Sequence, residues 1–353
     1  MGRYRCLRSK MHFFYAPKEV LCPSHGRIQE QIPWAAPYSR ITYRLEYLIL
    51  SLCQLMTQKA AARLLHMPKS TLSDLLHRSI SRIREGHRIV DIDKLGIDEI
   101  SYSKGHKYAT IVYDLDTQCV VWVAPGKGRE AADTFFNTAI TEAQRKKIRF
   151  ASCDMSKAYI GAIEHWCPQA ILVIDRFHIV KALNKAVDEV RKEQWREAQG
   201  TDKKALKGLR WLLFFHSKNR SKGDTRRLNE LKKLNRRIWR AWILKDEFEA
   251  FWEYIYVGSA ETFFYGWITI ALRSRLEPMK EFARMLKRHA HRILPFVQTK
   301  LTNAISEGIN RVIKIVKNRA SGYANLTSFT DMIFLTVGDL DLPAQISSDF
   351  RTL

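Results

Sequence analysis

Two hydrophobic periodicities divide the chain of 353 residues. Between residues 91 and 180, short apolar runs alternate with turn residues, a pattern typical of β-strands. Before and after this stretch, apolar residues recur at the spacing of an amphipathic helix. The pattern therefore predicts an α/β module that is preceded and followed by helical modules.

The central block predicts an element order of β-β-β-α-β-α-β. We expect helices at about 129–145, after the third strand, and at 156–165, after the fourth. The five predicted strands cover residues 94–100, 108–113, 119–123, 148–154 and 170–175. Three antiparallel strands followed by strands reached through helices form the ribonuclease H-like arrangement. The predicted fold class is therefore α/β, with a mixed five-stranded sheet and flanking helices as the catalytic core.

Residues 46–90 predict a helix-turn-helix region. Thr57 can cap a first helix over 58–65, residues 66–69 interrupt it, and a second helix starts at Ser70 or Thr71. An ordinary pair of antiparallel helices is the alternative. The exposed side of the second helix carries polar side chains that can contact phosphates and base edges in a major groove, namely Lys69, Ser70, Thr71, Ser73, His77 and Arg78.

The net charge of the chain indicates the kind of partner that it binds. Lys and Arg total 59 against 36 Asp and Glu, a net charge of +23. Such an excess favours a polyanion, DNA or RNA, as partner, because each neutralised phosphate releases counterions. A merely basic or ribosome-binding protein is the alternative. Residues 181–295 are predicted to be a basic all-α insertion, whose tryptophans can stack on bases or belong to a core.

Three carboxylates are the candidate catalytic groups. Asp98 lies in the first predicted strand of the sheet and Asp154 at the end of the fourth, and these strands are neighbours in a ribonuclease H-like sheet. Glu307, Arg311 and Lys314 lie on the polar face of a helix predicted over 302–319. Carboxylates that converge can hold two divalent ions for phosphoryl transfer. Each acid also has a simpler explanation: a turn cap, a helix N-cap or a solvated charge beside Arg311.

The N-terminal region predicts little regular structure. Cys22 and His25 are half of a possible zinc site, and a surface turn is the alternative, since zinc requires four ligands. The six cysteines are irregularly spaced, which indicates a reducing compartment. We expect no signal peptide and no apolar run that spans a bilayer, and hence a cytoplasmic protein.

Four sequence motifs together resemble the ISL3 family of bacterial insertion-sequence transposases. They cover residues 96–99, 153–159, 175–181 and 302–310, and the resemblance extends over about residues 20–340. It implies a DDE catalytic domain in which a helical insertion precedes the final Glu. It assigns Asp98, Asp154 and Glu307 to the catalytic, metal-binding triad. Independently of the resemblance, Arg311 and Lys314 are candidate DNA contacts in the basic surface around these acids.

The resemblance also marks Asp175, Phe177 and His178 as a motif near the site. Asp175 is expected to support a metal ligand or to orient His178, and Phe177 and Val180 are alternatively core residues. The family begins with a zinc-binding module, of which only Cys22 and His25 match the second half. Residues 1–45 are therefore interpreted as a remnant, which makes an inactive, truncated copy one alternative.

The predicted domain order is a zinc-module remnant (1–45), a helix-turn-helix region (46–90), the first part of the core (91–180), the insertion (181–295) and the completing helices (296–340). The predicted function is a transposase that uses two Mg²⁺ or Mn²⁺ ions, cuts the element's terminal inverted repeats and joins them to target DNA. We expect a homodimer on double-stranded DNA at the nucleoid. A DNA-binding regulator and a structure-selective nuclease of the same fold are the alternatives.

Overall fold

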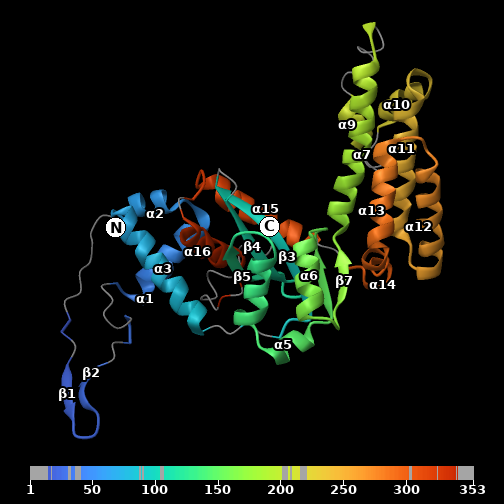
Figure 1. The fold of residues 1–353 in the computed structure, drawn as a ribbon. Helices are drawn as coiled ribbons and strands as arrows, with labels where there is room; N and C mark the ends of the chain where they lie inside the picture. Colours follow the sequence, from blue (N-terminus) through green and yellow to red (C-terminus); the bar gives the residue numbers. More distant parts are fainter. Residues whose placement is uncertain are drawn as a thin grey trace. The chain divides into compact units, whose positions relative to one another are not determined.

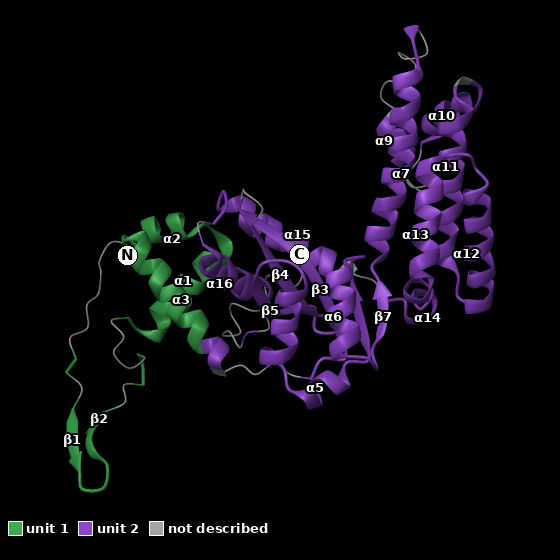
Figure 2. Cartoon of the chain, in the orientation of Figure 1, with its two compact units in different colours: residues 1–82, 342–353 green, residues 83–341 purple. Residues whose placement is uncertain are grey.

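The chain forms two compact units in the computed structural model, one of residues 1–82 and 342–353 and the other of residues 83–341 (Figure 2). Each unit is considered by itself below. The structure describes residues 15–16, 18–30, 33–35, 41–86, 89, 91–103, 107–200, 206, 209–214, 221–301, 304–323, 325–338 and 340.

The first unit contains a hairpin of β1 (Glu19–Cys22) and β2 (Gly26–Gln29), and then α1 (Tyr43–Leu55), α2 (Gln58–Leu64) and the start of α3 (Lys69–Gly86). Thr57 caps α2 by accepting the backbone N–H of Ala60. His66 turns the chain between α2 and α3 with a left-handed φ of 51°. The predicted pair of helices is confirmed, and α3 begins one residue earlier than expected.

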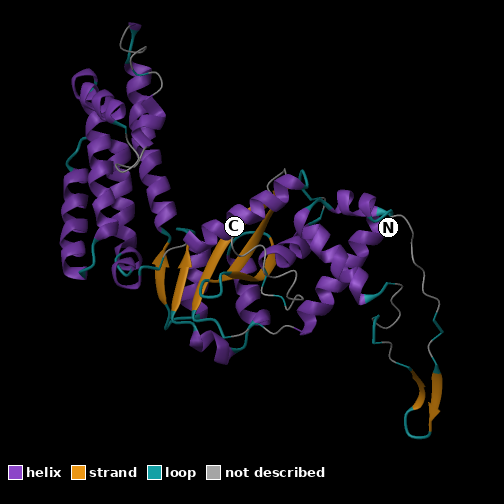
Figure 3. Cartoon of the chain, turned by 180° about the vertical axis from the view of Figure 1, so that it is seen from behind, coloured by secondary structure: helices purple, strands orange, loops and turns teal. Residues whose placement is uncertain are grey.

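A mixed five-stranded sheet forms the centre of the second unit (Figure 3). Its order is β5-β4-β3-β6-β7, in which β3, β4 and β5 are antiparallel and β6 and β7 run parallel to β3. The predicted ribonuclease H-like arrangement is therefore confirmed. The strands are β3 (Lys94–Ser103), β4 (Lys107–Asp114), β5 (Cys119–Pro125), β6 (Phe150–Cys153) and β7 (Ile171–Ile174).

Helices cover both faces of this sheet. Leu95 and Ile97 of β3 point into an apolar cluster that also contains Phe135 and Ile163 from the helices after β5 and β6. The other face receives α15 (Ala304–Arg319) and α16 (Leu326–Val337), which pack against β3 and β5 respectively (Figure 1). Alternate residues of a strand face opposite sides, so Gly96 and Asp98 face α15.

The single helix predicted over 129–145 is wrong. The chain forms α4 (Arg129–Thr134), a π-helical turn (Phe135–Ala139) and, after a break, α5 (Glu142–Lys147). Ile140 is extended, and Thr141 and Gln144 form a capping box that starts the new helix. The apolar spacing continues across this break, so periodicity alone missed it. Helix α6 (Lys157–Trp166) follows β6 close to the prediction.

A helical insertion separates β7 from α15. Phe248 lies at its centre, with its ring centroid 4.8 Å from that of Trp267 and 5.9 Å from that of Phe282. Buried aromatic rings hold these helices together. The helices are α7 (Arg176–Glu197), α9 (Leu209–Phe214), α10 (Lys222–Leu234), α11 (Arg236–Phe248), α12 (Val257–Leu272), α13 (Glu277–Ile293) and α14 (Phe296–Thr299), with a 3₁₀ turn at Glu249–Glu253.

The tryptophans of the insertion divide between core and surface. Trp242, Trp252 and Trp267 are buried, which confirms the core interpretation for them. Trp211 is 66% exposed, and Arg210 lies over its ring. Within the part of the chain that the structure describes, no helix is both long and apolar enough to cross a membrane.

Candidate active site

The strand register places three aspartates in one row. The paired register of β3 and β6 ends at Gly96 and Ser152, and Asp98 and Asp154 each lie two residues beyond that pair, Asp98 within β3 and Asp154 just after β6. Neighbouring strands are about 4.8 Å apart, so these two carboxylates start from adjacent backbones. Cys153 pairs with Ile174 of β7, which extends the same row to Asp175.

Asp98 is held at both carboxylate oxygens. The backbone N–H of Glu99 donates to Oδ1 at 2.7 Å, and Nδ2 of Asn310 donates to Oδ2 at 2.6 Å. A carboxylate oxygen has two lone pairs, so each oxygen keeps one for a further ligand. The orientation of Asp98 is therefore set by the protein while its capacity to bind a cation is retained.

Several acidic side chains lie close enough at this site to change one another's pKa. Burial raises the pKa of Asp98, the negative charge of Asp154 raises it further, and the N–H of Glu99 and the charge of His178 lower it. Burial also raises the pKa of Glu99, where Lys127 acts in the opposite direction. Acids that repel each other in a partly buried place are stabilised by a cation between them. The electrostatics thus suit a positively charged ligand.

Asp154 lies just after β6, as predicted. Its Oδ1 accepts the backbone N–H of Ser156 at 2.8 Å, and Ser156 is the residue directly before α6. The N-cap residue of α6 is Ser156 and not Asp154. The helix-capping explanation for Asp154 is therefore wrong in its simple form, although the carboxylate does support the turn that leads into the helix.

Glu307 lies in the first turn of α15, and its side chain is exposed. It precedes Asn310 by three residues, and residues with this spacing are neighbours on a helix surface, with Cβ atoms about 5–6 Å apart. Asn310 is bonded to Asp98, so Glu307 lies one helical turn before a residue that contacts the candidate site. Arg311 and Lys314 are exposed on the same helix.

The donor set fits a hard divalent cation better than zinc. Asp98, Asp154 and Glu307 offer carboxylate oxygens, the ligands that Mg²⁺ prefers while it retains several waters. In the described residues, no three His, Cys, Asp or Glu side chains gather closely enough to hold a metal as they stand. Burial raises the pKa of Asp98 and the charge of Asp154 raises it further, whereas Glu307 does not complete a set of three ligands with these two aspartates among the described residues.

In the motif at the start of α7, Asp175 has a structural role as the helix cap. Asp175 is buried and caps α7, because its Oδ1 accepts the backbone N–H of Phe177 at 3.0 Å. His178 Nε2 lies 3.7 Å from Asp175 Oδ2. Phe177 is 45% exposed, so the alternative that it is a core residue is wrong, and Val180 is half-buried.

Two residues beside the acids escaped the sequence analysis. Tyr113 of β4 is fully buried and its hydroxyl donates to Asn310, and Glu99 shares the charge environment of Asp98. For Asn310 the available signal is its position one helical turn after Glu307. Nothing in the sequence of β4, KYATIVYD, marks Tyr113 as a partner of Asn310.

On α3, the polar side chains predicted to meet DNA are at the surface. Lys69, Ser70, Thr71, His77 and Arg78 are exposed and Ser73 is half-buried. Leu72, Leu76 and Ile80 are buried, as expected for the opposite face of an amphipathic helix.

The Cys22 and His25 side chains meet at the turn of the β1–β2 hairpin. Cys22 Sγ lies 3.4 Å from His25 Nδ1 and 3.2 Å from Ser24 Oγ. Hydrogen bonds from Ser24 and then His25 lower the pKa of the thiol to about 7. The surface turn is confirmed, and two ligands are half of a tetrahedral zinc site. Cys6 lies outside the described residues.

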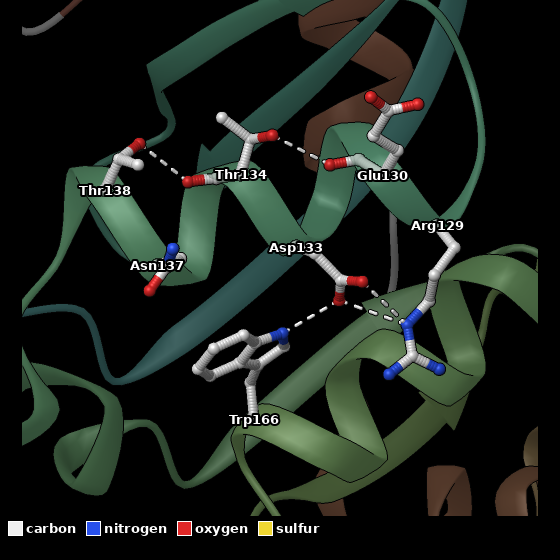
Figure 4. Close-up of a pocket in the computed structure, with 7 residues that line it drawn as sticks. All are labelled: Arg129, Glu130, Asp133, Thr134, Asn137, Thr138 and Trp166. Carbon is white, nitrogen blue, oxygen red and sulfur yellow. Dashed lines mark hydrogen bonds and ion pairs between the residues drawn. The ribbon is translucent and has the colours of Figure 1, made fainter.

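A groove of about 450 Å³ lies away from the acids, between α4 and α6 (Figure 4). Asp133 accepts hydrogen bonds from Arg129 Nε at 3.0 Å and from Trp166 Nε1 at 2.8 Å. The hydroxyl groups of Thr134 and Thr138 donate to backbone carbonyls of their own helix. These hydrogen bonds thus join α4 to α6 through Asp133 and Trp166 and otherwise stay within one helix.

The fold and site define a helix-turn-helix protein with a ribonuclease H-like catalytic core. Comparison with known families agrees. A model of the ISL3 transposases, described as "Transposase", matches residues 95–333, and a second, described as the helix-turn-helix domain of transposase family ISL3, matches residues 30–80. The chain therefore belongs to the ISL3 family of transposases.

Curated relatives carry the same assignment. The chain is 32% identical over 306 residues to the transposase for insertion sequence element IS1001 of Bordetella parapertussis, covering 85% of this chain and 74% of that protein. It is 25% identical over 346 residues to the transposase for insertion sequence element IS1557 from two strains of Mycobacterium tuberculosis, covering 91% of this chain and 77% of each relative.

Proposed function

We propose that this transposase cuts the ends of an insertion sequence and joins them to target DNA by metal-dependent phosphoryl transfer. Asp98, Asp154 and Glu307 are the proposed catalytic, metal-binding residues. The observation that supports the proposal is the environment of Asp98: burial and then the charge of Asp154 raise its pKa, and Asn310, from the helix of Glu307, donates a hydrogen bond to it.

The protein's own contribution is to hold the acids in place. Asp98 and Asp154 would hold Mg²⁺ or Mn²⁺ from the sheet, and Glu307 would complete the ligand set from α15. A pair of such ions supplies Lewis-acid stabilisation of the attacking and leaving oxygens. Asp175 keeps the first turn of α7 beside this row by capping it, and His178 adds a group that is positively charged when protonated.

The DNA partners follow from the two basic surfaces. The exposed face of α3 would recognise the terminal inverted repeats through Lys69, Ser70, Thr71, Ser73, His77 and Arg78. Arg311 and Lys314 on α15 would neutralise phosphates near the acids. Two ends must be brought together, so a homodimer on DNA is proposed, acting at the nucleoid in the cytoplasm.

The test uses the full chain with intact ends of the element, which report cleavage, and with precut ends and a supercoiled target plasmid, which report joining. Wild type is expected to give joined products in Mg²⁺. The carboxylate-to-amide variants Asp98→Asn, Asp154→Asn and Glu307→Gln should lose at least ~10²-fold in rate while binding the ends with unchanged affinity. Glu261→Gln, at an exposed acid of α12, serves as the matched control and should remain active.

Each alternative has its own outcome. Cleavage without joined products would support a structure-selective nuclease of the same fold. Binding with no cleavage by either the wild type or the variants would support a DNA-binding regulator or an inactive copy. Either result contradicts the proposal.

A further inference from the structure

Two consecutive hydrogen bonds connect three elements at the acids. Tyr113 Oη of β4 donates to Asn310 Oδ1 of α15 at 2.5 Å, and Asn310 Nδ2 donates to Asp98 Oδ2 of β3 at 2.6 Å. Tyr113 is fully buried and Asn310 nearly so. The first bond is buried and the second partly buried. Away from water a hydrogen bond is strong, and a missing partner is costly.

The hydroxyl of Tyr113 determines which way the Asn310 amide points. With the tyrosine donating, the amide oxygen faces Tyr113 and the amide nitrogen faces Asp98. If the amide were turned over, its oxygen would face the Asp98 carboxylate, and two acceptors would oppose each other. The tyrosine thus selects the amide orientation that binds the ionised form of Asp98.

Helix α15 lies along β3 with matched spacing. A Cβ atom at Gly96 would lie 3.1 Å from Ser306 Oγ, and Lys317 Nζ donates to the backbone oxygen of Ser101 at 2.6 Å. From Ser306 to Lys317 the helix rises about 16 Å, and from Gly96 to Ser101 the strand advances about 16 Å. The bond between Asn310 and Asp98 lies between these two contacts.

We propose that Tyr113 is a positioning residue of the metal site, an inference that rests on the proposed function. Through Asn310 it holds the Asp98 carboxylate in a single orientation, and it holds the part of α15 that carries Glu307 against the same strand. Tyr113 touches neither metal nor DNA. Mutation of a residue that orients a metal ligand typically weakens metal binding 10–100-fold, and we expect an effect of this kind for Tyr113.

The chain offers a matched control for this tyrosine. Tyr159 of α6 is also buried, and its hydroxyl lies 3.0 Å from Thr110 Oγ1, on the face of the sheet that is covered by α6. Tyr113→Phe and Tyr159→Phe each remove one buried hydroxyl and keep the ring. A purely structural role predicts the same effect for both substitutions, whereas a positioning role does not.

The experiment measures Mn²⁺ binding to the full chain without DNA, by the electron paramagnetic resonance signal of free Mn²⁺, together with thermal unfolding. Tyr113→Phe should weaken Mn²⁺ binding by about 10-fold and raise the Mg²⁺ concentration needed for half-maximal cleavage by a similar factor. Tyr159→Phe should leave both values at the wild-type level. Equal Mn²⁺ affinity for the two variants overturns the proposal.

A double-mutant cycle tests the connection through Asn310, and its single variant Asn310→Leu, which should also weaken Mn²⁺ binding, remains informative if Tyr113→Phe folds poorly. Asn310→Leu removes both hydrogen bonds, so adding Tyr113→Phe to it should cause no further loss of Mn²⁺ affinity. Additive losses would mean that Tyr113 does not act through Asn310. Asp98→Asn separates the two proposals: if it retains cleavage, the proposed function fails, whereas if it is inactive and Tyr113→Phe binds Mn²⁺ normally, only the positioning role fails.

Discussion

Arg292 of α13 and Glu164 of α6 lie 128 positions apart in the chain and form an ion pair, with Nη2 at 2.6 Å and Nε at 3.0 Å from the same carboxylate oxygen. This contact connects the helical insertion to a helix of the catalytic core. Helix α13 also packs against β7, at the edge of the sheet. The ion pair joins the insertion to α6, and this packing joins it to β7, the strand that Asp175 follows.

Arg292→Gln should lower the free energy of unfolding by about 1 kcal/mol, because the guanidinium is largely buried but Glu164 is half exposed and screened by water. Denaturation by urea provides the measurement. Arg288→Gln, at an exposed position of the same helix, is the control and should change stability little. Equal effects of the two substitutions would show that the ion pair contributes nothing measurable.

Gly96→Ala should destabilise the core by about 1–3 kcal/mol and reduce cleavage, because the added methyl group overpacks the contact between β3 and α15. Its Cβ would lie 2.9 Å from Leu115 Cδ2 and 3.1 Å from Ser306 Oγ. Gly266→Ala is the matched control: a Cβ there meets no atom within 4 Å, and helix propensity favours Ala by about 0.8–1 kcal/mol. Thermal unfolding should shift in opposite directions for the two variants.

Arg78→Ala should weaken binding of the element's ends and reduce the slope of log affinity against log salt concentration by about 1, because one phosphate contact is lost. Lys146→Ala removes the same charge from α5, where Lys146 is paired with Glu142, and should leave that slope unchanged. Fluorescence anisotropy over a range of salt concentrations measures both. Identical slopes for the two variants would exclude Arg78 from the DNA interface.

Cys22 should react with iodoacetamide with a midpoint near pH 7, since its pKa is lowered to about 7 from an ordinary 9.0. The thiolate is the reactive form, so the rate rises as pH passes through this value. Ser24→Ala should move the midpoint upward more than His25→Ala, because Ser24 is the larger cause. Peptide mass spectrometry in a Cys6→Ser background follows the reaction, and a midpoint near 9 in the parent would contradict the hydrogen-bonded turn.

Elements whose signals are local were predicted well from the sequence. The helix-turn-helix depends on caps and breaks within a few residues, such as Thr57 and Pro68, and the strands depend on apolar runs ended by turns. The same reasoning failed between 129 and 147. There the apolar spacing continues through Ile140, while the capping box at Thr141 and Gln144 ends one helix and begins another.

The sequence by itself determined which acids are candidates, the order of the strands and the basic character of the chain, because these follow from residue type and short-range spacing. Only the tertiary structure decided that Asp98, Asp154 and Asp175 share one row, since strand register is set by packing between distant segments. Likewise, only the structure placed the Tyr113 hydroxyl against Asn310, 197 positions away. The sequence does not indicate which residue a buried tyrosine contacts. Here the partner comes from α15, which packs on the sheet.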